Sequence, residues 1–243
     1  MSSSSPLPAP GRRGESRELT RGRLMRFGRR AFARKGLAGT NLKDDILAPA
    51  RVSVGSFYHQ FADKTELLLE ILRQHSETFL RMMHEAHRPE GSGDPQAIAG
   101  HSFATVFRVA EENDDLFRIM IREHSSDDPR VRAYLRENRR RWIESLAEDY
   151  RAIGRQSGGP VAEFDDDGLR LAAELISAMT LGMVLDYLDR PPRERPALRE
   201  QRIAALTLFT LGGVAGLMSA APARAARQTA PPVKISRSRK GAR

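Results

Sequence analysis

The sequence predicts an all-α protein, and three observations lead to this fold class. Apolar residues recur at helical spacing in most segments between the two polar ends of the chain. The breaks between these segments are short and rich in Gly, Pro, Asn and Asp, which punctuate helices. No run of alternating β-branched residues indicates a strand. With 243 residues, the chain is long enough for one or two domains and a sizeable core.

The N-terminal part is expected to hold a disordered arm followed by one helix. Residues 1–16 are rich in Ser, Pro and Gly, a composition that does not favour a packed structure. The first helix is predicted over residues 18–35, because Gly36 suits the position just beyond a helix end. The apolar residues of this helix form one stripe: Leu24, Phe27, Ala31 and Phe32.

Two short helices joined by a tight turn are expected next, followed by a longer one. Thr40 or Asn41 is predicted to cap the first short helix, and Ser53 the second. The stretch from Asp63 to Glu66 resembles a capping box, so the longer helix is expected to start there and to end near residues 87–89. Its broad apolar face comprises Leu67, Leu68, Ile71, Leu72, Phe79 and Met83.

Residues 89–95 are expected to form a loop, and the rest of the chain is expected to be helical up to residue 219. The chain from Pro222 onward is rich in Ala, Pro and Arg and is predicted to be unstructured. The sequence has no Cys, which excludes disulfides and thiolate metal sites. The five further helices are predicted near residues 96–112, 114–124, 128–155, 166–189 and 197–219.

Positive charge is concentrated near the two ends of the chain. Residues 11–35 carry ten basic and two acidic side chains, and residues 222–243 carry seven basic and no acidic ones. Residues 89–221 carry 17 basic and 22 acidic side chains, within a chain of net charge +9. Clustered Lys and Arg neutralise phosphates and dominate non-specific affinity for DNA. The alternative is that the Arg-rich ends are ordinary solvated segments.

The segment from Ser53 to Phe61 is small and polar at its start and aromatic at its end. A helix with small, exposed residues at its start can approach base edges in the major groove of DNA, as the second helix of a helix-turn-helix does. Gly55 has no side chain, so the backbone can come close to a base edge, and serine hydroxyls can bond bases or phosphates. This segment therefore indicates a DNA-binding protein.

Residues 18–75 resemble the DNA-binding domain of the tetracycline-repressor (TetR) family of bacterial transcription regulators. The resemblance implies an all-α fold: an N-terminal three-helix helix-turn-helix DNA-binding domain followed by a C-terminal helical ligand-binding and dimerisation domain. Its matching features are the apolar stripe of the first helix, Lys35-Gly36, Thr40, Ile46, Ala50, Val52-Ser53, Gly55 to Phe61, Lys64 and Glu66 to Leu68. The expected divisions are a basic arm at 1–16, the DNA-binding domain at 17–62, the helical domain at 63–220 and a basic tail at 221–243.

Two departures from the family pattern concern the first short helix and the turn after it. The family usually has Gly where this chain has Arg51, so a different turn geometry or a strain of a few tenths to about 1 kcal/mol is expected. The stretch around Asp45 is one residue longer than usual, and Pro49 sits late in the helix. Because Pro is poorly tolerated inside a helix, this helix is expected to be short or bent.

The expected DNA-binding residues come from the helix-turn-helix and its flanks. The resemblance implies that Thr40, Tyr58, His59 and Lys64 meet phosphates. For Phe57 and Tyr58 a role in the core is the alternative, and it is the preferred one for Phe61. The full set is Thr40, Lys43, Ser53, Val54, Gly55, Ser56, Phe57, Tyr58, His59 and Lys64. An N-terminal arm that follows the DNA backbone or enters the minor groove is also expected, with Arg12, Arg13, Arg17 and Arg21.

The last two predicted helices are the expected pairing surface of a homodimer, because apolar groups cover much of their circumference. Single helix-turn-helix heads contact few base pairs and commonly act in symmetric pairs. The resemblance implies pairing through residues 166–189 and 197–219, and the alternative is an internal core in a monomer. The apolar groups are Leu171, Leu175, Ile176, Met179, Leu181, Met183, Val184 and Leu188, then Ile203, Leu206, Leu208, Phe209, Leu211, Val214, Leu217 and Met218.

The resemblance also implies a cavity for a small-molecule effector that shifts the population between two spacings of the DNA-binding heads. The effector is expected to be largely apolar, because Met and aromatic side chains suit adaptable apolar pockets. Plain core packing is the alternative for each lining candidate, and His101, Arg122 and His124 are candidates for orienting a polar group. The lining candidates are Phe103, Phe107, Met120, Trp142, Met179 and Met183.

The sequence lacks the motifs of common enzyme classes. Residues 154–160 lack the ending of a phosphate-binding loop, and no Gly-x-Ser-x-Gly elbow or Cys nucleophile is present. The acidic run at 165–167 indicates a helix start rather than a cation site, and His59 has no partner at ligand spacing. We therefore expect no enzyme activity, no cofactor and no metal.

These observations predict a sequence-specific transcription regulator, and a repressor in particular because most of the family represses. A non-specific architectural nucleic-acid-binding protein is the alternative. The cytoplasm, with association to the nucleoid, is the expected location, because residues 1–16 lack the apolar core of a secretory signal. No membrane partner is expected, since apolar runs such as residues 175–185 are shorter than the roughly 20 residues of a membrane span.

Overall fold

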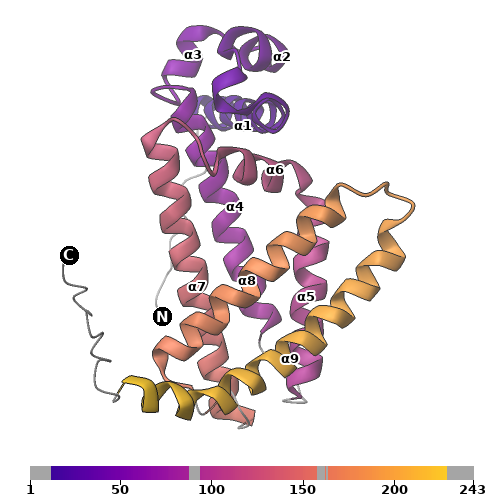
Figure 1. The fold of residues 1–243 in the computed structure, drawn as a ribbon. Helices are drawn as coiled ribbons and strands as arrows, with labels where there is room; N and C mark the ends of the chain where they lie inside the picture. The colour runs from indigo at the N-terminus through magenta and orange to yellow at the C-terminus, as the bar shows by residue number, and fades with distance from the viewer. Residues whose placement is uncertain (1–11, 88–93, 158–161, 163, 229–243) are drawn as a thin grey trace, which may run out of the picture.

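The computed structural model describes residues 12–87, 94–157, 162 and 164–228, and every regular element in these ranges is helical. Figure 1 shows a small head, formed by α1 to α3, at one end of the molecule, and α8 and α9 running diagonally across the larger body. The predicted all-α fold is confirmed. The elements are α1 (Arg12–Gly39), η1 (Leu42–Leu47), α2 (Ala48–Ala50), α3 (Val54–Tyr58), α4 (Lys64–Ala86), α5 (Pro95–Glu112), α6 (Asp114–Glu123), α7 (Pro129–Ser157), α8 (Asp166–Leu188) and α9 (Arg195–Gln228).

The two terminal helices extend into segments for which disorder was predicted. α1 begins at Arg12 rather than near residue 18, and α9 continues to Gln228 rather than ending near residue 219. Once a helix is anchored by packing, each further residue adds one hydrogen bond without a new nucleation cost. Residues 223–228 are Ala, Arg and Gln, which favour helices. The remainder of the predicted arm and tail, residues 1–11 and 229–243, lies outside the described residues.

Gly36 breaks the direction of α1, as predicted for the residue beyond a helix end. Its φ of 70° and ψ of 174° are non-helical, and glycine reaches this conformation without the penalty that a Cβ would impose. A Cβ at this position would also lie 2.9 Å from Cδ of Arg122 in α6. Gly36 therefore allows both the turn at the end of α1 and close packing of α6 against the head.

The extra residue near Asp45 is accommodated as a π-helical turn. Within η1, the N–H of Ala48 donates to the carbonyl of Lys43, a five-residue spacing that absorbs one additional residue. Pro49 then lies in the first turn of α2, where a missing N–H leaves no helical bond unmade. Asn41 is the N-cap, and its side chain accepts hydrogen bonds from the N–H groups of Lys43 and Asp44. The first short helix is therefore short and irregular, as Pro49 predicted.

Arg51 keeps the conformation that the family's usual glycine would adopt. Its φ of 53° and ψ of 46° lie in the left-handed region, so the cost is strain rather than a different turn. We expect Arg51→Gly to raise the free energy of unfolding by about 0.5 kcal/mol, because the relief of strain exceeds the extra entropy of glycine in the unfolded chain. Urea denaturation of the two proteins measures this difference. Unchanged or lower stability of the variant would contradict it.

Two hydrophobic clusters hold the head and the body together. The first joins α1, η1, α3 and α4, and it also includes Leu116 and Ile119 of α6 and Val131 of α7. The second lies among α4, α5, α6, α8 and α9. α6 therefore packs against both the head and the body.

α8 has the length and the mean hydropathy of a membrane-spanning helix, 23 residues and 1.5, and is the one helix in the described ranges with both. The apolar run at residues 175–185 is interrupted by Glu174 and Asp186, as predicted, but the mean hydropathy of a longer window of this helix is still high enough for a span. One face of α8 is buried against α7 and α9. α8 is therefore a core helix of the body in this fold.

Candidate nucleic-acid interface and ligand cavity

The five-residue helix α3 is held in place by a cap at one end and by aromatic packing at the other. The Ser53 hydroxyl accepts the N–H of Ser56 at 3.1 Å, which confirms the predicted N-cap. Phe57 and Phe61 are buried in the head core, with ring centroids 5.8 Å apart. Because so short a helix is marginal alone, these tertiary contacts fix its direction.

The predicted groove-facing residues of α3 divide between the surface and the core. Val54 and Tyr58 are 51% and 57% exposed, and His59 is exposed beside them. The space above Gly55 is open, since a Cβ there would meet no atom within 4 Å. Phe57 is fully buried, so its prediction as a groove-facing residue is wrong: it is the residue through which α3 packs on the head.

Lys64 and Thr40 lie together although 24 residues separate them. The Lys64 ammonium donates to the Thr40 carbonyl at 3.0 Å, which joins the start of α4 to the start of η1. The Thr40 side chain is buried and its hydroxyl donates to the Gly36 carbonyl at 2.6 Å, so of the two predicted N-caps, Thr40 or Asn41, it is Asn41 that caps the first short helix. Lys43 is exposed at the first turn of η1.

The arginines of the predicted arm are not all free. Arg21 forms an ion pair with Glu70 at 2.7 Å and lies over the Phe61 ring, so it belongs to the head. The Arg17 side chain is exposed, and its carbonyl accepts a hydrogen bond from Gln60. The side chains of Arg12 and Arg13 lie outside the described residues. No motif in the sequence distinguishes the exposed basic residues farther along α1: Arg23, Arg26, Arg30 and Arg34.

A cavity of about 730 Å³ lies among α4, α5, α6, α7, α8 and α9 in the body. Phe103, Met120 and Trp142 line it, as predicted. Three other candidates do not line it, because they pack into neighbouring core. Phe107 is fully buried edge-on against Tyr187, and Met179 and Met183 pack against the second hydrophobic cluster.

Of the three polar residues predicted to orient a ligand, one lines the cavity and two do not. His124 lines the cavity, whereas His101 and Arg122 are exposed and do not. No pattern in the sequence indicates His75, which lines the cavity between the rings of Phe79 and Phe117. Burial, and secondarily the Arg29 guanidinium, lowers the pKa of His75 to about 4. His75 is therefore a neutral imidazole at neutral pH.

The sequence of the head matches a known protein family. The sequence profile described as "Bacterial regulatory proteins, tetR family" matches residues 24–71, which span α1, the helix-turn-helix and the start of α4. The head is a TetR-type DNA-binding domain. The relatives that the chain resembles are transcriptional regulators rather than enzymes.

Individual relatives are similar to this chain over longer spans. An uncharacterised helix-turn-helix transcriptional regulator of Haemophilus influenzae is 24% identical over 180 residues, which are 74% of this chain and 82% of that protein. The transcriptional regulator AcuR of Cereibacter sphaeroides is 33% identical over 111 residues, which are 44% of this chain and 48% of that protein. The solved structure of Salmonella enterica GusR superposes with a TM-score of 0.63 at 25% identity, covering 82% of this chain and 95% of that one.

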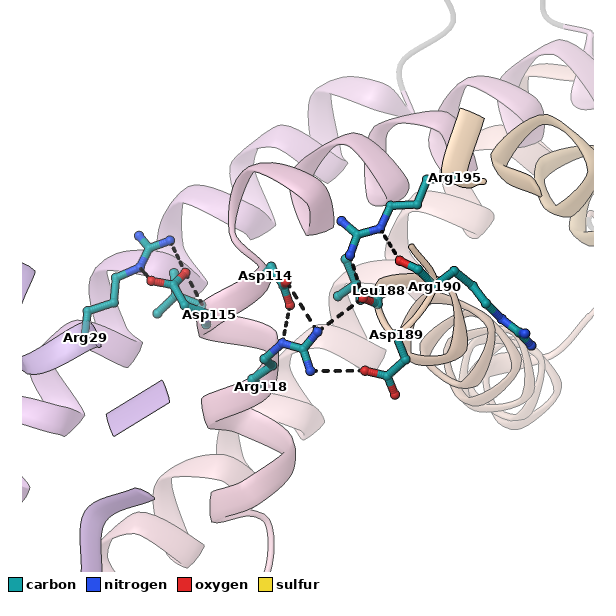
Figure 2. Close-up of polar contacts among 9 residues, drawn as sticks. Arg29, Asp114, Asp115, Arg118, Leu188, Asp189, Arg190 and Arg195 are labelled. Carbon is teal, nitrogen blue, oxygen red and sulfur yellow. Dashed lines mark hydrogen bonds and ion pairs between the residues drawn. The ribbon is translucent and has the colours of Figure 1, made fainter. Parts of the chain in front are cut away.

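The N-terminal end of α6 connects the head to the corner between α8 and α9 (Figure 2). Asp115 forms a two-pronged ion pair with Arg29 of α1, and the same arginine donates to Asn113 at 3.3 Å. The adjacent Asp114 pairs with Arg118 at 2.7 Å. Figure 2 shows the Arg118 guanidinium between α6 and the end of α8, where it reaches Asp189 at 3.1 Å and the Leu188 carbonyl at 3.2 Å.

The C-terminal end of α6 is attached to the head by a buried carboxylate. Glu123 is buried and accepts the N–H of Leu37 at 2.7 Å, just beyond the turn at Gly36. The two residues are 86 positions apart, so sequence spacing gave no signal for this contact. Both ends of α6 are therefore attached to the head.

We expect Glu123→Gln to lower the free energy of unfolding by about 1 kcal/mol, because a neutral amide replaces the charged acceptor of the Leu37 N–H. Chemical denaturation monitored by circular dichroism measures this change. Glu112→Gln is the control, since Glu112 is exposed and pairs only with Arg108 on the same helix. Equal, small effects of the two substitutions would show that the buried contact does not stabilise the attachment of the head.

Large apolar side chains remain exposed on α8 and α9. Leu175 and Leu181 are 46% and 44% exposed, and Leu208 and Phe209 are 66% and 65% exposed. The predicted pairing surface also includes Ile176, Val184, Leu188 and Leu206, but these are buried in the internal core and cannot contact another chain. The side chains of Val214, Leu217 and Met218 lie outside the described residues.

Proposed function

We propose that this regulator is a repressor that a small molecule releases from its operator. The observation that carries the proposal is the position of α6. Phe117, Met120 and Ile121 of this helix line the cavity, while Asp115 and Glu123 hold the head. An occupant that displaces α6 therefore changes the position of the head.

The DNA contacts that we propose come from the exposed part of the helix-turn-helix. Ser53, Val54, Gly55 and Ser56 at the start of α3 face base edges, and Tyr58 with His59 meets phosphates. Lys43 and Lys64 add charge at the rim. The domain division at residues 62 and 63 follows from these roles, with α4 as the link between the DNA-binding and effector-binding parts.

A homodimer is the second part of the proposal, and the exposed apolar residues of α8 and α9 support it. Exposed side chains as large as Phe209 and Leu208 are favourably removed from water when two copies pair. A Cβ on Gly182 or Gly212 would meet no atom within 4 Å, so the chain's own packing does not require glycine there. Close approach of a second copy would explain the absence of side chains at both positions.

Coupling would operate as a population shift between two head positions. The effector must bind the arrangement of α6 that places the two heads at a spacing unsuited to the operator. Coupling free energies in such systems are about 1–3 kcal/mol, which corresponds to a loss of operator affinity of about 5- to 150-fold. We place this activity in the cytoplasm, at the nucleoid.

A footprint on the DNA upstream of the protein's own gene tests this proposal. A protected, near-palindromic site supports a dimeric regulator, and loss of protection on addition of a small hydrophobic molecule supports release by an effector. Uniform, weak protection along the fragment would instead support a non-specific architectural protein. Transcription from the same fragment in vitro distinguishes repression from activation.

A further inference from the structure

The charge of the cavity lining restricts the chemical class of its ligand. Among the described residues that line the cavity none is Asp or Glu, and the one Lys or Arg is Arg139 in α7. A cationic ligand that entered the cavity would lose its hydration and gain no opposite charge there. An anionic ligand would gain the guanidinium of Arg139 as its counter-charge.

The interior of the cavity is mainly apolar, and several of its polar groups are already hydrogen-bonded within the protein. The indole N–H of Trp142 donates to the Ser177 hydroxyl at 2.9 Å. Ser102 and Thr180 each donate to the carbonyl four residues earlier in their own helices. Thr210 has a buried hydroxyl without a partner among the described residues, but it is neutral. The interior therefore suits an apolar body rather than a charged group.

Exposed lining residues on α6 and α7, outside the proposed pairing surface, mark an opening of the cavity. Ile121 is an apolar residue of this opening, and Arg139 is its charged residue. Arg139 has no carboxylate partner within the described part of the chain, whereas the next residue, Arg140, pairs with both Glu137 and Glu144. The guanidinium at the opening is therefore available to a ligand.

From this arrangement we infer that the cavity binds an amphiphilic anion, with its apolar body inside and its head group paired with Arg139. A carboxylate is the matching head group, because the planar guanidinium fork donates to both of its oxygens. The volume of about 730 Å³ accommodates a ligand of drug-like size. The inference rests on the proposed function, since it assigns the class of the effector.

The chain supplies its own probe for the test, because Trp142 is its single tryptophan and lines the cavity. Three ligands with the same ten-carbon chain and different head groups are titrated at pH 7.5, with tryptophan emission as the readout: decanoate, 1-decanol and decylamine. We expect decanoate to bind about tenfold more tightly than 1-decanol, and decylamine to bind most weakly. This ratio corresponds to one charge-assisted pair.

Arg139→Gln should weaken decanoate binding by about five- to tenfold and leave 1-decanol binding unchanged. Arg136→Gln is the matched control, because Arg136 is exposed on the same helix, does not line the cavity, and its substitution makes the same change in charge. Both positions are exposed, so neither variant is expected to affect folding.

Equal affinity for the three ligands, or an undiminished affinity for decanoate in the Arg139 variant, would overturn the inference. Operator binding measured with and without decanoate separates this outcome from failure of the proposed function. If decanoate binds through Arg139 and the operator complex persists, the cavity binds amphiphilic anions as inferred. The proposal that such a ligand releases the protein from its operator is then contradicted. If a different compound releases the operator while decanoate does not bind, the ligand class is wrong and the regulatory proposal stands.

Discussion

Replacement of Tyr58 by alanine is expected to weaken operator binding by about 10- to 100-fold, which corresponds to the loss of a hydrogen bond to a charged phosphate. The side chain is 57% exposed at the end of α3, where it contacts Phe57 edge-on without being buried. Removing it therefore leaves the core of the head intact. Fluorescence anisotropy with a labelled operator fragment at fixed salt measures the effect.

Two further substitutions distinguish the contribution of the Tyr58 hydroxyl to operator affinity from that of its ring and from general effects on the head. Tyr58→Phe retains the ring and should lose most of the affinity, because the proposed phosphate contact is made by the hydroxyl. Leu19→Ala is the control for an exposed apolar side chain on α1, which is 70% exposed, and should leave affinity unchanged. Full affinity of both Tyr58 variants would show that this residue does not contact the operator.

The second large effect concerns the dependence of stability on pH. The ordinary pKa of a histidine is 6.5, whereas burial and the nearby Arg29 lower the pKa of His75 in the folded protein to about 4. Between these values the unfolded chain binds a proton that the folded chain does not bind. The free energy of unfolding therefore falls as the pH is lowered from about 6.5 to about 4.

His75→Phe should remove this contribution while retaining an aromatic ring between Phe79 and Phe117. At pH 4.5 the variant should be more stable than the wild-type protein by about 2–3 kcal/mol beyond any difference at pH 7.5. His101→Gln, at an exposed histidine, serves as the control. Denaturant unfolding at a series of pH values measures this, and parallel pH profiles of wild type and His75→Phe would contradict the assignment.

The parts of the fold that depend on local chemistry could be predicted from the sequence. Ser53 and Asp63 cap their helices as predicted, because an N-cap needs only a short polar side chain and the free N–H groups two or three residues later. Gly36 and Pro49 likewise act through backbone geometry. The helix bounds beyond residue 95 follow from the same kind of signal, apart from the end of α9.

The directions of individual side chains could not be predicted in the same way. Phe57 and Tyr58 are adjacent aromatics on a five-residue helix, and only the packing of α3 on the head decides which of them is buried. Met183 was a plausible lining residue by composition, yet it packs on the second cluster beside the cavity. Apolar periodicity indicates that a face is buried, but it does not distinguish a core from a cavity wall.

The contacts that attach the head to the body also could not be predicted from the sequence. Arg29 and Asp115 are 86 residues apart, as are Leu37 and Glu123, and no local pattern links residues at such a distance. In an Arg-rich chain, each acidic residue has many candidate partners. These contacts follow only from the way that α6 crosses α1.

The most direct test of sequence-specific DNA binding through α3 compares the affinity of the purified protein for operator DNA with its affinity for unrelated DNA. The protected fragment from the footprint and an equal length of unrelated DNA are titrated at the same salt concentration, and the mass of each complex is measured by analytical ultracentrifugation. We expect two chains per operator and an affinity at least about 10³-fold above that for unrelated DNA. Equal affinity for both DNAs would contradict the claim that α3 reads a specific sequence.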